Sequence, residues 1–557
     1  MVKVNFLNEN KIVDAEEGNT IETIARKAGV FVETPCGGEG NCGKCKVKVS
    51  DMNAVFVMDS NKKISDGELD ENIVLACQTK VIGDVCVITS VDKEANETMQ
   101  ILSEGKDLAV EINPLYHKEF VPDLGQTRVY KGMEPVGMEK GNTSDKLYGV
   151  TVDIGTTTLV ATLVDCLTGE QIDDLSSLNP QCAYAQDVVS RIKYTSTAED
   201  GLRVLYEAVR DEINNMIREL CEKNKVAAEY IYEVVYSGNT TMMHLATDTD
   251  PYSLGQYPYT PVISGGNDID VRKCGLIISE FGSVYLPPII SSYVGADITS
   301  GVLACKLADK VKNVLFIDIG TNGEMILEIN GKLTACSTAA GPAFEGMNIT
   351  FGMRAGNGAI EYFKITDDDI EIRTIGDKEA KGICGSGLFD VVGELVRVGI
   401  IEKNGKIIKK EKCTLSKNIV DRITKYEGKS AFLVADNVYL TLLDIRQIQL
   451  AKSAIRAGIE AMTGLNKARM SDIDEVYIAG SFGYHLTPES LVNTGIIPKE
   501  LQGKIKFVGN TSKTGGNAFL LNVNTRKYIS EVVKEINTIE LSDYPGFEAL
   551  FIEKMSF

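Results

Sequence analysis

The sequence has no excess of basic residues. Its 557 residues include 58 lysines and arginines against 78 aspartates and glutamates, which gives a net charge of −20. A surface of this sign repels nucleic-acid backbones and anionic lipid, because a nucleic-acid partner is normally held by a basic face. We therefore expect no nucleic-acid partner and no binding to a membrane surface.

Long hydrophobic runs are also missing. No stretch of about 18 apolar residues occurs, as a membrane span would require. The first residues, MVKVNFLNENKIV, lack a basic region followed by an apolar run, so they do not read as a targeting peptide. We expect a cytoplasmic protein. Disulfides are rare there, so the 13 cysteines are better explained as metal ligands or buried thiols.

The chain is long enough for several domains, and its pattern changes along its length. Residues 1–92 alternate short β-like runs with one helical stretch, which indicates a small α+β domain. Residues 93–145 are polar and interrupted by prolines, and we predict a linker that carries at most a short strand. From 146 to 540, apolar runs ending in glycine-rich turns alternate with amphipathic helical patterns, as is typical of an α/β domain. Residues 541–557 would form a C-terminal tail.

One internal repeat stands out in the α/β part. The segment VDIGTTT (152–158) returns as IDIGTNG (317–323). This repeat predicts two duplicated lobes, over about 146–312 and 313–540.

Four cysteines have a spacing that suits a metal centre. Cys36, Cys42 and Cys45 lie in the glycine-rich segment CGGEGNCGKC, and Cys77 follows in LACQT. Four thiolates are the ligand set of a [2Fe-2S] cluster, and the glycines allow the loop to wrap it closely. A four-cysteine zinc site is the alternative, although such sites usually show two CxxC pairs. Cys86 competes with Cys77 as the fourth ligand, but its alternating run VCVITS is typical of a core thiol.

Each copy of the repeat predicts a hairpin that presents backbone N–H groups and hydroxyls to phosphate. Its first strand ends in an acidic residue, Asp153 or Asp318, which would hold Mg²⁺ through water. One such hairpin is weak evidence, since any tight hairpin can contain Asp-Gly, but an ordered pair is more specific. The predicted phosphate-binding residues are Gly155, Thr156, Thr157, Gly320, Thr321 and Asn322.

Three further segments are candidates for nucleotide contact. VYIAGSFG (476–483) runs an apolar strand into small residues against which adenine or ribose would fit, and GICGSGL (382–388) opens a helix whose N-terminus receives negative charge. On the helix predicted over 441–465, Lys452 and Arg446 would reach ribose or phosphate, with surface solvation as the alternative for one of them. The predicted contacts in the first two segments are Gly480, Ser481, Phe482, Gly483, Gly385, Ser386 and Gly387.

In their order along the chain, these motifs resemble the phosphate-1, phosphate-2 and adenosine motifs of the actin/heat-shock-chaperone/sugar-kinase superfamily. Residues 1–92 resemble the [2Fe-2S] ferredoxins, with the spacing of the adrenodoxin-like branch. The resemblance implies a multidomain α/β protein. Its N-terminal domain would be an α+β ferredoxin-like (β-grasp) domain, followed by two RNase-H-like lobes that close on ATP.

A ferredoxin domain fused to such an ATPase resembles the family of reductive activators of corrinoid proteins, over nearly the whole chain. The marks are the four cysteines, the two DIGT hairpins, the AAGPAFEG segment (339–346) and the CGSGL turn. The resemblance implies ATP-dependent transfer of an electron from the [2Fe-2S] cluster to reduce Co(II) to Co(I) in a methyltransferase or O-demethylase system. A corrinoid protein and a low-potential electron donor would be the partners, and a homodimer is left open.

The segment CSTAAGPAFEGMN (336–348) carries a sharper hypothesis. It would line the cleft that faces the corrinoid protein, with Ser337 approaching the cobalt. The alternative is a loop that only closes the nucleotide site.

Three other functions remain open from sequence. A small-molecule kinase with an accessory redox domain would need a catalytic base, which the sequence does not identify. An activator of a 2-hydroxyacyl-CoA dehydratase or benzoyl-CoA reductase would place a [4Fe-4S] cluster between subunits, yet the ATPase part has no close cysteine pair. A chaperone-like binding module would leave the four cysteine ligands unexplained.

Overall fold

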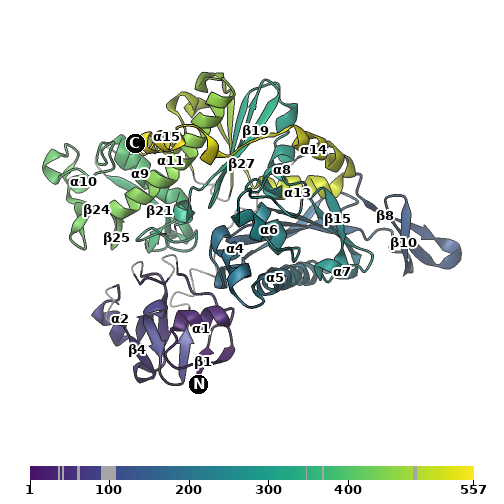
Figure 1. The fold of residues 1–557 in the computed structure, drawn as a ribbon, viewed down its shortest axis with the longest axis horizontal. Helices are drawn as coiled ribbons and strands as arrows, with labels where there is room; N and C mark the ends of the chain where they lie inside the picture. Colours follow the sequence, from purple (N-terminus) through teal and green to yellow (C-terminus); the bar gives the residue numbers. More distant parts are fainter. Residues whose placement is uncertain are drawn as a thin grey trace. The chain divides into compact units, whose positions relative to one another are not determined.

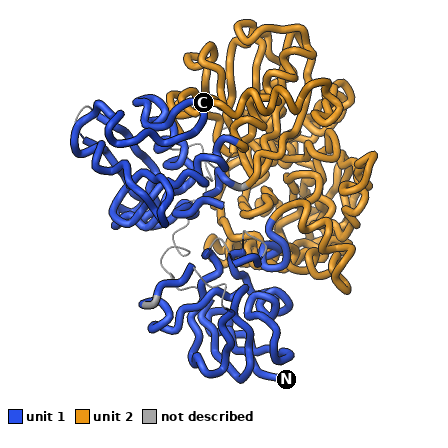
Figure 2. Tube along the Cα trace, turned by 60° about the vertical axis from the view of Figure 1, so that its left-hand side comes forward, with its two compact units in different colours: residues 1–100, 180–186, 342–449 blue, residues 101–179, 187–341, 450–557 orange. Residues whose placement is uncertain are grey.

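The computed structural model describes residues 1–34, 38–40, 43–58, 63–89, 108–346, 348–366, 369–480 and 486–557. Contacts divide the chain into two units, coloured separately in Figure 2. Unit 1 comprises residues 1–100, 180–186 and 342–449, and unit 2 comprises residues 101–179, 187–341 and 450–557. In the described part of the chain, no helix has the length and apolarity that a membrane span requires.

The N-terminal part of unit 1 is a mixed five-stranded sheet with helix α1 (Ile21–Lys27) against it, as Figure 1 shows. Strand β1 alternates as VKVNF, so Val2, Val4 and Phe6 all enter the core. The Thr20 side chain caps α1 by accepting a hydrogen bond from the Thr23 N–H at 3.2 Å. The sheet order is β2-β1-β7-β3-β5, with β4 and β6 as a separate pair. This is the predicted ferredoxin-like β-grasp domain.

The remaining elements of this domain are β1 (Val2–Phe6), β2 (Lys11–Ala15), β3 (Lys46–Val49), β4 (Val55–Val57), α2 (Asp66–Asp70), β5 (Ile73–Leu75), β6 (Thr79–Val81) and β7 (Val85–Ile88).

The segment that we predicted as a linker is more ordered than expected. Its described part contains a three-stranded antiparallel sheet of β8 (Tyr116–Val121), β9 (Gln126–Lys131) and β10 (Glu134–Lys140). The prolines misled the prediction, because Pro122 lies in the turn after β8 and Pro135 lies at a register shift in β10. Both are positions where a sheet tolerates proline.

The described part of unit 2 contains two six-stranded sheets that share the order and direction of five strands; the sixth strand differs, because β15 lies beside β16 and β28 lies at the other edge, beside β19. The first has the order β13-β12-β11-β14-β16-β15 and the second β27-β26-β17-β18-β19-β28. In each, a hairpin and its antiparallel neighbour (β11-β12-β13 or β17-β18-β19) are extended by two parallel strands (β14-β16 or β26-β27). The repeat seen in the sequence is therefore a repeat of topology, and the predicted pair of RNase-H-like lobes is confirmed.

The first sheet and its helices are β11 (Tyr148–Ile154), β12 (Thr158–Asp165), β13 (Gln171–Leu178), α4 (Val188–Thr197), α5 (Gly201–Asn224), β14 (Ile231–Gly238), α6 (Thr240–Leu245), β15 (Asn267–Asp270), α7 (Val271–Cys274), β16 (Ser283–Leu286) and α8 (Ala296–Ala304).

The second sheet and its helices are β17 (Val314–Ile319), β18 (Gly323–Ile329), β19 (Lys332–Thr338), α11 (Leu442–Leu465), β26 (Glu475–Ala479), α12 (Pro488–Asn493), β27 (Ile505–Gly509), α13 (Thr511–Leu521), α14 (Val523–Glu535), β28 (Asn537–Ile539) and α15 (Phe547–Glu553). The predicted C-terminal tail thus contains one helix.

Residues 342–449 form two small three-stranded sheets with two helices, inserted between β19 and most of α11. These elements are β20 (Ala359–Ile365), β21 (Ile370–Thr374), β22 (Gly382–Ile383), α9 (Gly385–Arg397), α10 (Lys417–Asp421), β23 (Ile423–Tyr426), β24 (Lys429–Ala435) and β25 (Val438–Thr441).

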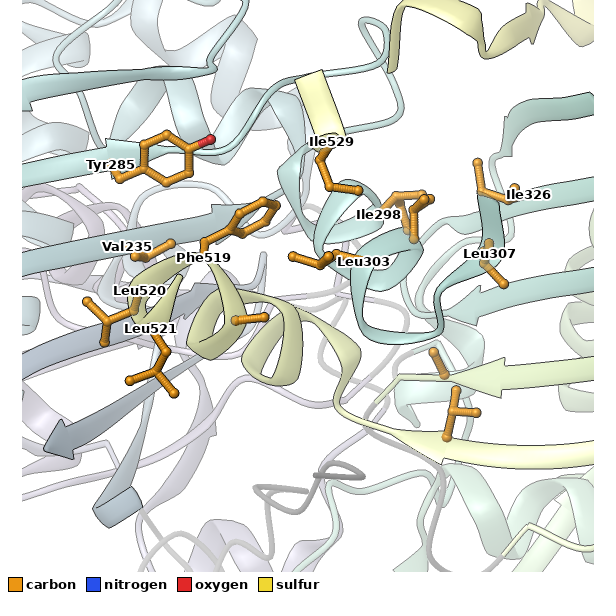
Figure 3. Packing of buried hydrophobic residues seen from close by; sticks show 14 of the residues in the cluster. Val235, Tyr285, Ile298, Leu303, Leu307, Ile326, Phe519, Leu520, Leu521 and Ile529 are labelled. Carbon is orange, nitrogen blue, oxygen red and sulfur yellow. The ribbon is translucent and has the colours of Figure 1, made fainter. Parts of the chain in front are cut away.

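Helices α8 and α13 lie between the two large sheets and share one hydrophobic core with both (Figure 3). Phe519 of α13 packs on Tyr285 of the first sheet, with ring centroids 5.6 Å apart. The helices approach closely because Gly515 faces α8, where an added Cβ would lie 2.1 Å from the carbonyl oxygen of Ser300. Gly149 in β11 likewise leaves room for Leu520. Helix α13, which follows β27 of the second sheet in sequence, thereby covers the first sheet.

Candidate iron–sulfur and nucleotide sites

Two of the four predicted cluster ligands lie side by side. The Sγ atoms of Cys45 and Cys77 are 3.2 Å apart, too far for a disulfide of about 2.05 Å. Both residues are buried, Cys45 just before β3 and Cys77 in the turn between β5 and β6. The backbone joins them as well, because the Ala76 N–H donates to the Cys45 carbonyl at 2.8 Å. Cys36 and Cys42 lie outside the described residues.

The surroundings of Cys77 favour a thiolate. The hydrogen bond from Cys45 is the main factor that lowers the pKa of the Cys77 thiol to about 7, and the Gln78 side chain and the Gly40 N–H contribute in the same direction. The Gln78 amide also donates to the carbonyl of Gly38 at 2.9 Å, which ties the loop to this turn. A low-pKa thiol near a second thiol suits binding to iron or zinc, since a coordinating thiol is deprotonated.

The loop glycines allow two things that other residues would not: a positive φ angle and a close approach of neighbouring atoms. Gly38, Gly40 and Gly43 all have positive φ angles, of 90°, 75° and 75°, which other residues rarely adopt. At Gly40 an added Cβ would also lie 2.6 Å from the Gln78 side chain. The competing Cys86 lies half-buried on β7, where its N–H bonds to the Ser50 hydroxyl. The described residues therefore fit the proposed cluster with Cys77 as a ligand.

In the first hairpin, Asp153 is held by residues from the other end of the chain. The Asn510 side chain donates to the Asp153 carboxylate at 2.8 Å, and the Ser512 side chain bonds to it as well. Burial nevertheless raises the pKa of Asp153 to about 6, against these two hydrogen bonds. Asn510 caps helix α13 at the same time by accepting from the Lys513 N–H. The N-terminus of α13 therefore faces this hairpin.

Three side chains fix the turn of the first hairpin. The Asn179 amide donates to the Gly155 carbonyl at 2.8 Å, and the fully buried Arg191 donates to the Thr156 carbonyl at 2.5 Å. The Asn239 amide donates to the Thr156 hydroxyl at 3.1 Å. The predicted phosphate-binding turn, which continues into Thr157, is thus preformed by its neighbours.

The second hairpin places Asp318 among other acids. Burial raises the pKa of Asp318 to about 8, with further repulsion from Asp297 and Asp153. Gly480, at the end of β26, lies against this aspartate: an added Cβ would be 2.8 Å from its Oδ1 and 2.6 Å from the Ile319 carbonyl. The structure therefore brings together Asp153, Asp318 and Gly480, which the sequence places in three separate motifs.

Asp297 and Glu324 complete a group of four carboxylates, and neither was predicted. Burial raises the pKa of Asp297 to about 7, and the pKa of Glu324 rises well above its usual range for the same reason. Repulsion from Asp153 adds to the first shift, and repulsion from Asp297 and Asp318 adds to the second. The three aspartates keep some contact with solvent, which screens them in part.

Burial raises the pKa of all four carboxyl groups, so a nearby cation would favour their ionised forms. Among the described residues, no three carboxylate, histidine or cysteine side chains converge closely enough to hold a metal directly. Such an arrangement is compatible with Mg²⁺, which usually keeps several waters and takes one or two carboxylates together with phosphate oxygens.

Ser337 lies at the end of strand β19 rather than in a loop. It stands directly opposite Glu324 in the antiparallel pairing of β18 and β19, so the two side chains share a face of the sheet. The remaining predicted adenosine contacts, Ser481, Phe482 and Gly483, lie outside the described residues.

The CGSGL turn opens helix α9 in unit 1, as predicted from its glycines. Gly385, Ser386 and Gly387 are its first three residues, and an added Cβ at Gly387 would lie 2.0 Å from the Ile360 carbonyl. Close packing on β20 thus accounts for this glycine, while contact with a nucleotide stays a prediction.

The two basic residues predicted to reach the nucleotide have protein partners. The Lys452 amine is buried and donates to the Ser556 carbonyl, and desolvation lowers its pKa to about 7. Arg446 donates to the Asn404 carbonyl at 2.9 Å and to the Gln449 side chain. These contacts hold neighbouring chain segments, and a nucleotide role for either residue stays a prediction.

Weak signals in the sequence mark the functional residues that were missed. Asp297 lies in VGAD at the start of α8, a small-residue turn followed by an acid, as in the two hairpins. Asn510 lies in GNTSKTGGN, where polar and small residues open a helix after a strand. Neither segment repeats the DIGT motif.

Comparison with known families covers most of the chain. Residues 5–81 match the 2Fe-2S iron-sulfur cluster binding domain. Residues 148–310 match the RACo middle region, and residues 312–557 match the C-terminal domain of RACo, the ASKHA domain.

Individual relatives extend over the whole length. The chain is 28% identical to the corrinoid activation enzyme RamQ of Eubacterium limosum, over 98% of this chain and 97% of that protein. It is 24% identical to the [Co(II) methylated amine-specific corrinoid protein] reductase of Methanosarcina barkeri, over 71% of this chain and 74% of that protein. A solved structure titled as a reductive activator for corrinoid,iron-sulfur protein shares 31% identity and a TM-score of 0.73, and covers 100% of this chain and 98% of that one.

Proposed function

Because the chain belongs to the family of reductive activators of corrinoid proteins, we propose that it uses ATP to pass an electron from an N-terminal [2Fe-2S] cluster to a corrinoid protein. The cobalt of that partner would be reduced from Co(II) to Co(I). The observation that carries the proposal is the presence, in one chain, of paired thiols for a cluster and two facing phosphate hairpins for a nucleotide.

The thiols of Cys45 and Cys77 would hold the cluster together with Cys36 and Cys42. When bound, the cluster supplies a single low-potential electron. The chain keeps the two described thiols buried and close, lowers the pKa of Cys77, and aims the Gly40 N–H at its sulfur. The electron would enter from an external low-potential donor.

The two hairpins would grip the phosphates of ATP, with Asp153 and Asp318 oriented toward Mg²⁺ through water. Mg²⁺ supplies the positive charge that four clustered carboxylates lack. Each large sheet contributes one hairpin, so Mg²⁺ bound with the nucleotide would relieve the repulsion among acids of both lobes as the lobes close. ATP would thus favour one arrangement of the lobes over another, which is the differential binding that an uphill electron transfer requires.

The test is anaerobic spectroscopy with matched cysteine variants. Reduced protein, Mg-ATP and a Co(II) corrinoid protein should give the Co(I) absorption. We expect Cys77→Ala to lose both the cluster spectrum and Co(I) formation, whereas Cys86→Ala, with a thiol in the same domain, should keep both. A variant Cys77→Ala that retained an intact cluster would contradict the ligand assignment.

A second variant tests the nucleotide half of the proposal. Asp318→Ala should keep the cluster spectrum but slow ATP hydrolysis and Co(I) formation by about 10²- to 10³-fold, the usual cost of removing a preorganised charge from such a site. Wild-type rates in this variant, or no Co(I) with any corrinoid protein tested, would overturn the proposed coupling.

A further inference from the structure

The loop that carries the predicted cluster ligands is bordered by two lysines that contact residues far along the chain. Lys44, next to Cys45, donates to the Gly352 carbonyl at 2.6 Å. Lys63 packs on the loop, since an added Cβ at Gly43 would lie 3.1 Å from its Cβ. Its amine pairs with the Glu427 carboxylate, at 2.7 and 2.8 Å from the two oxygens. All these residues belong to unit 1.

The chain just before the loop makes three more contacts of this kind. The Arg354 guanidinium lies 5.3 Å from the ring centroid of Phe31. The Gln186 amide donates to the Thr34 hydroxyl at 3.2 Å. The Tyr184 hydroxyl fills the space beside Gly29, where an added Cβ would lie 2.3 Å from it.

The contacts therefore involve the chain just before the loop, the end of the loop itself and Lys63, which packs on the loop. We define the cluster face as residues 29–34, 43–44 and 63, and the docking surface as residues 184–186, 352–354 and 427. The cluster face flanks residues 35–42 on both sides in sequence. These contacts thus involve residues that flank the predicted ligand loop in sequence, or that pack on it, as Lys63 does on Gly43.

The polar, partly exposed contacts of this interface are typical of domains that associate reversibly. Among the described residues, its contacts include hydrogen bonds, an ion pair and a cation–π contact, and the side chains of Lys63 and Glu427 are 30% and 51% exposed. Partly solvated ion pairs contribute little stability, and interfaces between domains are commonly mobile unless they are large and hydrophobic. A permanent contact would bury apolar side chains instead.

We propose that the ferredoxin-like domain docks reversibly on the docking surface through its cluster face, so that a protein partner reaches the cluster only after this contact opens. The domain thereby has a covered and an open position. The identity of the partners rests on the proposed function, whereas the docking itself does not. The equilibrium between the docked and open positions would therefore control how readily a partner protein takes an electron from the cluster.

Charge reversal across the Lys63–Glu427 pair tests the docking in the full-length protein with its cluster. Lys63→Glu and Glu427→Lys should each raise hydrogen exchange in peptides that contain residues 350–355, by about threefold to tenfold, because repulsion replaces a partly exposed ion pair. The double variant restores the pair and should return exchange to the wild-type rate. Lys48→Glu, which reverses an exposed lysine on β3, is the matched control and should change nothing.

The functional measurement uses oxidised cytochrome c, which takes one electron from the reduced cluster and becomes ferrous. Both single variants should speed this oxidation, and the double variant should be slow again. Direct attraction between charges predicts a different result: cationic cytochrome c would be helped by Lys63→Glu but hindered by Glu427→Lys. Ferricyanide, a small oxidant, should react at similar rates with all variants.

Opposite effects of the two single variants, or unchanged hydrogen exchange in both, would overturn the docking proposal. Neither measurement involves a corrinoid or ATP. A failure to form Co(I) would therefore count against the proposed function alone.

Discussion

The two hairpins predicted to bind phosphate have nearly the same sequence but different surroundings. Both place an aspartate at the end of the first strand of a large sheet, Asp153 in β11 and Asp318 in β17. Asp153 receives hydrogen bonds from Asn510 and Ser512, and its pKa rises only to about 6. Burial, with further repulsion from Asp297 and Asp153, raises the pKa of Asp318 to about 8.

The turns differ as well. In the first hairpin Ile154 pairs with Leu159, so four residues lie between the paired positions, whereas Ile319 pairs with Gly323 and leaves three. The duplicated motif has therefore diverged. The aspartate of the first hairpin is held by polar partners within the chain, whereas the proposed Mg²⁺ would favour the ionised form of the aspartate in the second.

The largest predicted difference concerns the glycines that follow the two aspartate strands. An added Cβ at Gly155 would lie 2.6 Å from the Thr158 carbonyl oxygen, but at Gly320 the nearest atom is 3.7 Å away. Gly155→Ala should lower the free energy of unfolding by about 3 kcal/mol, because a backbone clash cannot relax easily. Gly320→Ala should change it by less than about 1 kcal/mol. Chemical denaturation measures both, and equal losses would contradict the difference between the turns.

The second prediction separates the aspartates by pH in protein free of nucleotide and Mg²⁺. A raised carboxyl pKa favours the neutral form in the folded state. Below the unfolded-state pKa near 4, such a residue does not lower the free energy of unfolding. Above that pH it lowers the free energy of unfolding increasingly, until the pH has passed the folded-state pKa. Asp318→Asn removes the titration. Its stability relative to wild type should therefore improve from pH 5 to pH 8, by about 2 kcal/mol.

Asp153→Asn is the comparison for this experiment. Since the pKa of Asp153 is about 6, most of its effect should appear between pH 4 and pH 6, with little further change up to pH 8. Thermal unfolding across this range measures both profiles. Identical profiles would mean that the two aspartates share one environment.

The smallest predicted effect concerns the partner of Asp153. Asn510→Ser keeps a side-chain acceptor for the cap of α13 but removes the amide that donates to the carboxylate. We expect a loss of about 1 kcal/mol at pH 8 and a smaller loss at pH 5, where Asp153 is protonated. Asn522→Ser is the control, because Asn522 caps α14 and donates to the Glu111 carbonyl, which does not titrate. Its loss should be independent of pH.

Much of the fold could be predicted because its secondary structure and turns follow from local sequence patterns. Alternating burial, glycine turns and the DIGT repeat identified the ferredoxin-like domain and the duplicated lobes. The strands β8–β10 were missed because prolines at Pro122 and Pro135 look the same in sequence whether they break a strand or lie at its turns and bulges. The domain boundaries proposed from sequence stay predictions.

The site was predicted less completely, because its residues come from distant parts of the chain. The hairpins were found through their own motif, but Asn510 reaches Asp153 across 357 positions. The acidity of Asp318 depends on Asp297, which lies on a helix of the first lobe. The partner of Lys452 was also not foreseen, since its amine bonds to the Ser556 carbonyl, and its contact with a nucleotide stays a prediction. Pairings of this kind are set by tertiary packing, which a single sequence does not contain.

Helix α13 has a consequence for how the chain folds during synthesis. It packs on the first sheet, with Leu520 against Gly149, yet it begins 225 residues after β16 ends. At roughly 5 to 20 residues per second, a ribosome needs about 10 to 45 seconds to make that stretch. During this interval the first lobe lacks both its covering helix and the asparagine that holds Asp153. The first lobe must therefore wait, with an apolar face uncovered, until nearly the whole protein has been made.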